Sequence, residues 1–446
     1  MVDIRDVRRP RRIVTGLDED GRSYFARVED VEEIEYEFVL PGPPQAEGNG
    51  QAPAAGHQAA PAEAKAAPKV WGGDHGGFYR VWGSDRLPIP LPTDGQAPFF
   101  DSEPSADEAV RALNRATILP PPLGVRVGWS RHLKAGQPGP FHFTDSTDML
   151  FIMAGQRGQI LDDGEVILRA GDVLIQNGTT HSHESTVDDP TVLGYIVVDA
   201  LRVGPHPPLE RLHRVSEPLG GHRAGEKWEK TPLAPWTAPT KPPGTYEGED
   251  RTPLAIQDIE APRRVVTGTN EAGNSFFARV EACEPADAAY PGLDPAAGHK
   301  LWRIWQIDRL PDLAPNPGVN APLDSRPTAD ETPEALRTAP LDPEPLGVNV
   351  SMVRVEPTAE AGPLHWRDVM DVIFVMSGEL TLILDSGEEQ DLRAGDVVVE
   401  NGTSHAWHNR GDAAAMLGIA SFSGVRFGAT PANGAQVGGA AETRVP

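Results

Sequence analysis

The chain has 446 residues, more than one hydrophobic core normally serves, so two domains are expected. It carries 65 acidic and 40 basic residues, for a formal net charge of -25, and such a surface would repel nucleic acids and anionic membranes. No apolar run approaches the roughly 20 residues that a membrane-spanning helix needs. We therefore expect a cytoplasmic protein with no nucleic acid or membrane partner. Cys283 is the single cysteine, so neither an intrachain disulfide nor thiol catalysis is expected.

An internal repeat organises the chain. The segment RRIVTGLDEDGRSYFARVE at 11–29 returns as RRVVTGTNEAGNSFFARVE at 263–281. Farther on, YRVWGSDRLP matches WRIWQIDRLP, and PPLGVRV matches EPLGVNV, in the same order. The chain is therefore predicted to contain two copies of one module.

Segments rich in proline, alanine and glycine mark the boundaries of the copies. Residues 41–69 have no counterpart in the second copy and predict a surface insertion without chemistry. The expected organisation is a first domain at 1–215, which includes this insertion, and a second domain at 253–430. A linker at 216–252 would join them, and a flexible tail would follow at 431–446.

The later half of each copy alternates short apolar runs with turns. MLFIM, DVLI and VLGYIVV in the first copy correspond to VIFVM, DVVV and MLGIA in the second, with Gly and Asp between them. Such runs are too short for helices and predict the strands of an antiparallel sandwich or barrel. ADEAVRALNRA near Ala106 and ADETPEALRTA near Ala329 predict a short helix before each barrel. The predicted fold class is all-β with short flanking helices.

Residues of the kind that bind metals recur in one order in both copies. The first copy has His142, Asp148, Gly155, Gly171, Asp172, Gly178 and His181; the second has His365, Asp371, Gly378, Gly395, Asp396, Gly402 and His405. This order resembles the cupin superfamily, whose first motif places two histidines and a carboxylate before a strand ending in Gly. Its second motif runs from Gly-Asp through a Gly to a final His. The resemblance covers residues 124–203 and 347–425, and it implies two tandem jelly-roll β-barrels, a bicupin.

The spacing of these residues is compatible with a metal site. His142 and Asp148 lie an even number of positions apart, so both side chains can point to one face of a strand, while His181 belongs to another strand. Two imidazoles and a carboxylate suit a divalent transition metal and leave positions for water, oxygen or substrate. We predict metal sites, with iron first and manganese, nickel or zinc as alternatives, at His142, Asp148 and His181 and at His365, Asp371 and His405.

Both copies depart from the usual cupin motif at one position. Thr144 and Arg367 stand where cupins usually have the second histidine of the first motif. Thr144 could hold a water on the metal, whereas the cationic Arg367 would repel the ion or bind a substrate carboxylate. Both are candidate catalytic residues, and the metal is expected in the first copy before the second. Because the second copy keeps a fuller ending from His405 to Asn409, either copy could be the degenerate one.

A Trp-x-x-Asp segment precedes each barrel. We take Arg80, Trp82, Arg303 and Trp305 as candidate substrate-binding residues, with an ion-paired lid on the barrel as the alternative. His183 and His408 are expected behind the ligands or at the surface, and Asp145 and Asp368 in turns.

The resemblance implies a metal-dependent enzyme that acts on a small oxygenated or carboxylated organic molecule. A mononuclear non-haem dioxygenase is the leading hypothesis. A Lewis-acid isomerase, cyclase or lyase is one alternative, and a non-catalytic bicupin that binds or stores a small ligand is another. The expected partner is a small-molecule substrate, and exposed sheet edges would allow a homodimer.

Overall fold

The computed structural model describes residues 3–34, 76–85, 87, 89–91, 120, 123–132, 142–185, 191–202, 256, 259–270, 274–287, 290–307, 312–313, 336–337, 342–343, 346–426 and 429–437. These residues are nearly all in strands, which confirms the all-β fold class. The insertion at 41–69, the linker at 216–252 and the helix predicted near Ala106 lie outside the described residues, as does most of the helix predicted near Ala329. No helix in the described part of the chain has the length and apolar character needed to cross a membrane.

Within these ranges each copy contributes thirteen strands and a short 3-10 helix. The elements of the first copy are η1 (Ile4–Asp6), β1 (Arg11–Leu17), β2 (Ser23–Asp30), β3 (Glu33–Ile34), β4 (Gly76–Ser84), β5 (Ile89–Leu91), β6 (Val125–His132), β7 (Ser146–Ala154), β8 (Gln156–Ile160), β9 (Glu165–Arg169), β10 (Val173–Asn177), β11 (Ser182–Ser185), β12 (Thr191–Asp199) and β13 (Leu201–Arg202). The elements of the second copy are β14 (Arg263–Thr269), β15 (Ser275–Ala282), η5 (Pro295–Ala297), β16 (Lys300–Ile307), β17 (Asp312–Leu313), β18 (Val348–Val355), β19 (His365–Trp366), β20 (Val369–Ser377), β21 (Glu379–Leu384), β22 (Glu389–Arg393), β23 (Val397–Asn401), β24 (His405–His408), β25 (Ala415–Arg426) and β26 (Ala435–Gln436).

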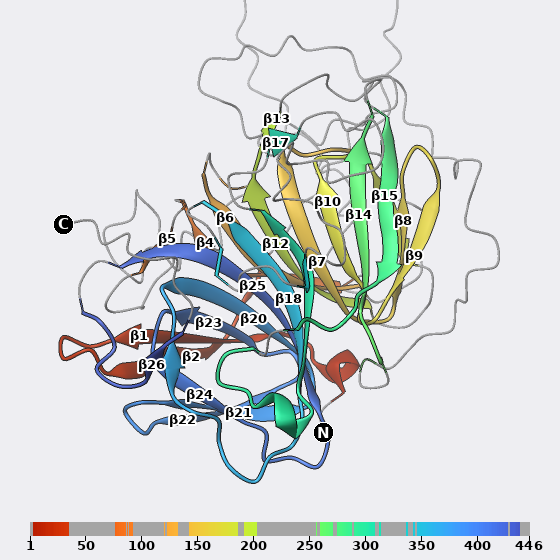
Figure 1. Cartoon of the computed structure of the whole chain (residues 1–446). Helices are drawn as coiled ribbons and strands as arrows, with labels where there is room; N and C mark the ends of the chain where they lie inside the picture. Colours follow the sequence, from red (N-terminus) through yellow and green to blue (C-terminus); the bar gives the residue numbers. More distant parts are fainter. Residues whose placement is uncertain are drawn as a thin grey trace, which may run out of the picture.

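The N-terminal hairpin of each copy lies on the sheet of the other copy. Strand β1 pairs with β2 and, in parallel, with β23 of the second copy, and β14 pairs with β15 and with β10 of the first. Figure 1 shows the red β1–β2 hairpin beside the blue β23, and the green β14–β15 hairpin beside the yellow β10. Each barrel sheet therefore contains a hairpin from the other copy, and the division into 1–215 and 253–430 stays a prediction about the chain sequence.

Equivalent polar contacts hold the two exchanged hairpins. The backbone N–H of Asn401 donates to the Thr15 hydroxyl, and its side-chain amide donates to the Thr15 carbonyl at 3.0 Å. Asn177 makes the same two contacts with Thr267, again with the amide at 3.0 Å from the carbonyl. Since these groups are buried, the contacts satisfy polar atoms that would otherwise have no hydrogen-bond partner between the two copies.

A hydrophobic core shared by both copies lies between the barrels. Phe151 and Phe374 meet there with ring centroids 5.4 Å apart. Each ring packs on a glycine of the other copy: a Cβ at Gly194 would lie 2.6 Å from Phe374, and a Cβ at Gly418 would lie 2.6 Å from Phe151. The two barrels therefore approach each other too closely for any side chain at these positions.

Trp82 and Trp305 belong to this shared core, where 2% and 1% of their surface is exposed. A bulge in β4 after Arg80 places Trp82 opposite Val127, while Arg80 lies opposite Gly128. On a regular strand, residues two positions apart point to the same face. The bulge between Arg80 and Trp82 interrupts this alternation and helps to direct the two side chains to different faces. The prediction that the two tryptophans bind substrate is not supported by this placement, because both side chains pack between the barrels.

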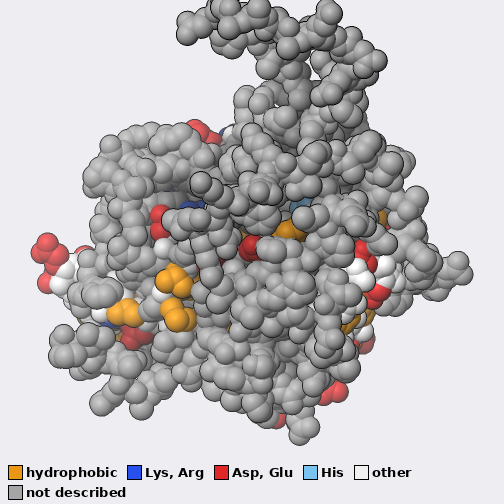
Figure 2. Space-filling model, turned by 90° about the horizontal axis from the view of Figure 1, so that it is seen from above, with side chains coloured by type: hydrophobic (Ala, Val, Ile, Leu, Met, Phe, Trp, Pro, Cys, Tyr) orange, Lys and Arg blue, Asp and Glu red, His pale blue; other side chains and the backbone are white. Residues whose placement is uncertain are grey.

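Part of the predicted flexible tail is paired with the second barrel. The backbone N–H of Ala435 donates to Leu364 at 3.1 Å, and that of Val437 donates to Trp366 at 3.0 Å. These backbone contacts continue to Val437, and the boundary at residue 431 stays a prediction. On the face of the molecule in Figure 2, acidic side chains lie at several separate places on the described surface.

Candidate active site in the first barrel

Polar side chains gather on the inner face of strands β8 and β11 of the first barrel. Gln159 lies directly opposite His183 in this antiparallel pair. Because side chains alternate between faces, Arg157 and His181, each two positions away, share that face. His181 is a predicted ligand, whereas no sequence motif points to Arg157 and Gln159.

His142 and His181 are direct neighbours. Their backbones exchange two hydrogen bonds of 2.9 Å, and their ring centroids lie 4.2 Å apart. Nδ1 of His181 is 2.8 Å from the Thr179 carbonyl, to which it donates, so Nε2 is the nitrogen that faces the barrel interior. Burial, with a contribution from His142, lowers the pKa of His181 well below its usual value. His181 is therefore a neutral imidazole at neutral pH.

The amide of Gln176 links Asp148 to His181. Its nitrogen lies 3.2 Å from Asp148 Oδ2 and 3.2 Å from His181 Nε2. Ser146 Oγ lies 2.7 Å from Asp148 Oδ1 and 2.7 Å from Thr144 Oγ1. The Ser146 hydroxyl has one proton, which is placed for donation to either of these two oxygens. Burial raises the pKa of Asp148 to about 6 despite these hydrogen bonds.

The donor types in the first barrel suit a divalent metal, but their arrangement does not form a three-ligand site. No group of three or more His, Cys, Asp and Glu side chains is placed to hold a metal ion anywhere in the described ranges. In the first barrel, the Gln176 amide nitrogen lies between Asp148 and His181, where it already serves both acceptors. A metal bound by His142, Asp148 and His181 would require this amide to move.

The guanidinium of Arg157 is buried inside the first barrel. Its side chain is 8% exposed, and within the described part of the chain its Nε has no hydrogen-bond partner and the group forms no ion pair. Burial lowers the pKa of Arg157 to about 10, against the opposing influence of Asp148. Arg80 is also buried, with Nη1 donating to the Tyr195 hydroxyl at 2.6 Å.

His183 lies inside this site, and not behind it or at the surface as the sequence had led us to expect. Its ring is stacked 6.2 Å from His181 and meets His142 edge-on at 5.9 Å. Among the described residues, its buried Nδ1 has no hydrogen-bond partner. Burial lowers the pKa of His183 well below its usual value, with Arg157 as the next cause. His183 is therefore a further neutral imidazole of the site.

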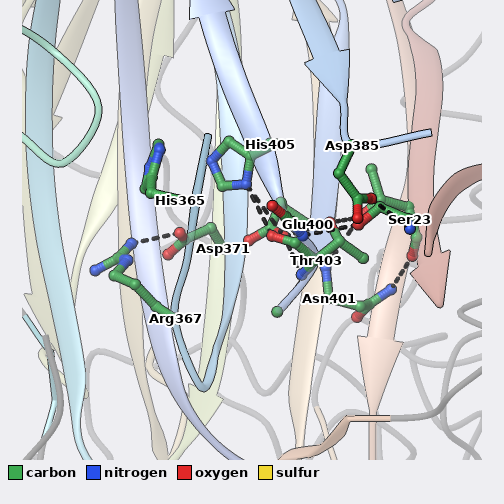
Figure 3. Close-up of polar contacts among 12 residues, drawn as sticks. Ser23, His365, Arg367, Asp371, Asp385, Glu400, Asn401, Thr403 and His405 are labelled. Atoms are coloured by element: carbon green, nitrogen blue, oxygen red, sulfur yellow. Dashed lines mark hydrogen bonds and ion pairs between the residues drawn. The ribbon is translucent and has the colours of Figure 1, made fainter. Parts of the chain in front are cut away.

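At the position of Thr144, whose side chain is a hydroxyl, the second barrel has Arg367, which forms an internal ion pair. Arg367 donates to Asp371 and, at 3.0 Å, to Asp342, and Figure 3 shows its guanidinium directed at Asp371. The same guanidinium lies 3.4 Å from the Ser421 hydroxyl and 5.7 Å from the centre of the Tyr290 ring. A role for Arg367 in binding a substrate carboxylate stays a prediction.

His405 is also paired with an acid in the second barrel. Its Nδ1 lies 3.5 Å from Glu400, which stands at the position of Gln176 and accepts a 2.5 Å hydrogen bond from the Thr403 hydroxyl. Burial lowers the pKa of His405, but the charge and hydrogen bond of Glu400, together with the hydrogen bond to Thr403, raise the pKa overall. A proton competes with a metal for the imidazole lone pair, so a raised pKa disfavours metal binding. His405 is therefore a poorer metal ligand than His181.

The two barrels also differ in how open their candidate residues are. His142, Asp148 and His183 are partly exposed, whereas His365 and Asp371 are 2% and 1% exposed. The segment of Gly292 covers His365 so closely that a Cβ there would lie 2.3 Å from the imidazole. Where the first barrel has Arg157, Gln159 and His183, the second has the apolar side chains Leu380, Leu382 and Trp407. The second barrel is therefore packed and closed at the site that is polar in the first.

Arg303, the second-copy counterpart of Arg80, is buried in the second barrel. Burial lowers the pKa of Arg303 to about 10, with Arg367 as the next cause and Asp342 opposing it. Its predicted role in binding substrate stays a prediction. Asp85 of the Trp-x-x-Asp segment pairs with Arg126 at 2.7 Å, as the alternative of an ion-paired lid requires. Its counterpart Asp308 lies outside the described residues.

Comparisons with known proteins identify a cupin domain in the second copy. The Cupin_2 family model, described as a cupin domain, matches residues 351–421. A "Phomopsin biosynthesis cluster protein C'" from Diaporthe leptostromiformis is 41% identical over 75 residues, 17% of this chain and 39% of that protein. A "Cupin-domain-containing oxidoreductase virC" from Hypocrea virens is 47% identical over 47 residues, 10% of this chain and 24% of that protein. The chain thus spans well under half the length of these curated relatives.

Solved structures give a weaker likeness. A mutant of oxalate decarboxylase from Bacillus subtilis aligns with 79% of this chain and 74% of its own at 13% identity and a TM-score of 0.35. A mutant of salicylate 1,2-dioxygenase from Pseudoaminobacter salicylatoxidans aligns with 67% and 71% at 13% identity and a TM-score of 0.32. TM-scores at this level do not establish a shared activity.

Proposed function

Because the chain belongs to the cupin superfamily, we propose that it is a cupin enzyme of the oxidoreductase class. Its substrate is a small oxygenated or carboxylated organic molecule, and the reaction takes place in the first barrel. The second barrel supports the first and exchanges a hairpin with it. The proposal is consistent with the relatives named as cupin-domain-containing oxidoreductases.

The contrast between the two interiors carries this proposal. In the first barrel, Asp148, His181 and Arg157 share one polar interior, and His142 and Asp148 are partly exposed. In the second barrel, the corresponding positions hold an ion pair, a histidine beside a glutamate or an apolar side chain. A fold needs no cluster of poorly satisfied polar groups for its stability, and such clusters are typical of functional sites.

The residues of the first barrel can bind and exchange protons. A carboxyl group with a pKa of about 6 is near the value that suits a general acid or base at neutral pH. In the metal-free site, Asp148 can therefore take or give a proton, while its Oδ2 accepts a hydrogen bond from the Gln176 amide. The neutral imidazoles of His181 and His183 can donate or accept hydrogen bonds without adding charge.

The finer assignment within this proposal is a mononuclear non-haem dioxygenase. A divalent transition metal, iron first, would be held by His142, Asp148 and His181 once the Gln176 amide has left them, and would supply a binding position for oxygen. The described residues as they stand do not form that site. Metal binding is therefore the step of the proposal that most needs measurement.

Elemental analysis of matched variants tests the proposal. The protein would be reconstituted anaerobically with iron(II), manganese(II), nickel(II) or zinc(II), and the metal bound per chain measured for the native protein, His181→Ala and His405→Ala. We expect about one equivalent per chain, lost in His181→Ala and kept in His405→Ala. Oxygen uptake with a panel of small acids should likewise be lost in His181→Ala and kept in His405→Ala. Asp148→Asn should also lose oxygen uptake. If no metal binds and no acid is consumed, the non-catalytic alternative replaces this proposal.

A further inference from the structure

We propose that Arg157 is the residue that binds the substrate, by its carboxylate group, inside the first barrel. The inference rests on the proposed function, because it names the substrate class of the same site. It concerns a small organic acid, in preference to a neutral oxygenated molecule.

The first argument is the isolation of the Arg157 guanidinium. Buried arginines are almost always paired, because an unpaired buried charge is costly. Two other buried arginines follow this rule, since Arg12 binds Glu29 and Arg264 binds Glu281, whereas the buried Arg80 donates to the neutral Tyr195 hydroxyl. Arg157 forms no ion pair with any described residue and leaves a buried Nε without an acceptor. A ligand that supplies an anionic acceptor would remove this cost.

The second argument is the charge around Arg157. The acid that acts on it is Asp148, whose carboxyl already accepts hydrogen bonds from Ser146 and Gln176. Arg80, also in this barrel, donates a hydrogen bond to the neutral hydroxyl of Tyr195. In the second barrel, by contrast, the single guanidinium of Arg367 is paired with two carboxylates, those of Asp342 and Asp371. The described part of the first barrel therefore offers more cationic than anionic groups to a ligand.

The third argument is the set of unsatisfied atoms beside Arg157. Gln159 Oε1 and His183 Nδ1 are both buried without hydrogen-bond partners in the described part of the chain. Gln159 lies two positions from Arg157 on the same strand face and opposite His183. Two positions along a strand span about 7 Å, a distance that a small organic acid can bridge. Arg157 would bind the carboxylate in its planar fork, while Gln159 and His183 bind the remainder of the molecule.

The inference makes a statement about stability as well as binding. Leu380 stands at the position of Arg157 in the second copy and packs in the apolar cluster. Arg157→Leu would therefore remove an unpaired buried charge and supply an apolar side chain that the fold accepts at the equivalent place. We expect this variant to have a higher midpoint of thermal unfolding than the native protein in the absence of ligand.

Calorimetric titration of the full chain tests the binding. The probes are lactate and benzoate, with lactamide and benzamide as uncharged matches, and inorganic phosphate as a simple anion. The proteins are the native chain, Arg157→Leu, Arg157→Gln and Arg410→Ala; Arg410 is an exposed residue paired with Glu389 and serves as the control. We expect at least one acid to bind once per chain and its amide at least tenfold more weakly. Both Arg157 variants should bind the acid at least tenfold more weakly than the native protein, whereas Arg410→Ala should bind it with unchanged affinity.

Several results would overturn the inference. The inference fails if an acid and its amide bind equally well, or if phosphate binds as well as the acids. It also fails if the native protein binds no acid, or if a folded Arg157 variant binds the acid as the native protein does. A lower unfolding midpoint for both Arg157 variants would show that the arginine is already satisfied in the empty barrel. If acids bind through Arg157 but are never turned over, the proposed function fails and this inference stands. If a neutral compound is turned over equally by native protein and Arg157→Leu, the enzyme stands and this inference fails.

Discussion

The guanidinium of Arg367 donates a hydrogen bond to the carboxylate of Asp371, and both side chains are almost completely buried. Each of these residues stands at a position where a cupin would usually hold a metal ligand. Their pairing uses the carboxylate for an internal contact, and Tyr290 and Asp342 surround the arginine. The second barrel thus keeps the framework of a site in which the arginine is paired with carboxylates of the same chain.

Replacing Arg367 with leucine should destabilise the protein strongly. Asp371 would lose its cation and remain buried, a change that typically costs about 3 to 5 kcal/mol. Urea unfolding, followed by circular dichroism, gives the free energy of unfolding. Adding Asp371→Leu should recover most of the loss, since the pair is then removed together. A loss below about 1 kcal/mol for Arg367→Leu would mean that the pair is not a buried one.

The His405–Glu400 pair predicts a particular dependence of stability on pH. The folded-state pKa of His405 is raised above its unfolded value, which is about 6.5. Its contribution is therefore complete below about pH 6.5 and is lost as the pH rises through the folded-state pKa. Between about pH 6 and 9, the free energy of unfolding should fall for the native protein relative to Glu400→Gln, which lacks the anion. Parallel pH profiles for the two proteins in urea unfolding would contradict the pairing.

Gly418 is expected to tolerate no side chain. A Cβ there would lie 2.6 Å from Phe151 across the boundary between the copies, and overpacking of this kind costs about 1 to 3 kcal/mol. Gly418→Ala should lower the free energy of unfolding by that amount, and Phe151→Leu should partly rescue it. If the two substitutions simply add in a double-mutant cycle, the glycine and the ring are not in contact.

The exchanged hairpins predict how the chain can be divided. A fragment of residues 1–252 keeps β1–β2, which has no β23 to pair with, and lacks β14–β15. A fragment of equal length, residues 31–282, carries the first barrel together with the hairpin that completes its sheet. The second fragment should be the more soluble and should show the more cooperative thermal unfolding. The opposite order would indicate that the hairpins belong to their own copies.

How much the sequence reveals differs between the fold and the site. The repeat and the alternating apolar runs predict the all-β fold, because strand patterning follows from which face is buried. The exchange of hairpins is not predictable in this way, since β1 and β14 have nearly the same sequence and could pair with either sheet. A motif search also misses Arg157 and Gln159, whose signal is the contrast with Leu380 and Leu382 in the second copy.

The central claim, that the first barrel is the working site, can be tested by locating a labelled acid. Crystals grown with 3-bromopropionate would be measured at the bromine absorption edge, where anomalous scattering gives the bromine position directly. The account predicts one bromine per chain, in the first barrel beside Arg157, and none beside Arg367. A bromine in the second barrel, or equal occupancy of both, would contradict it.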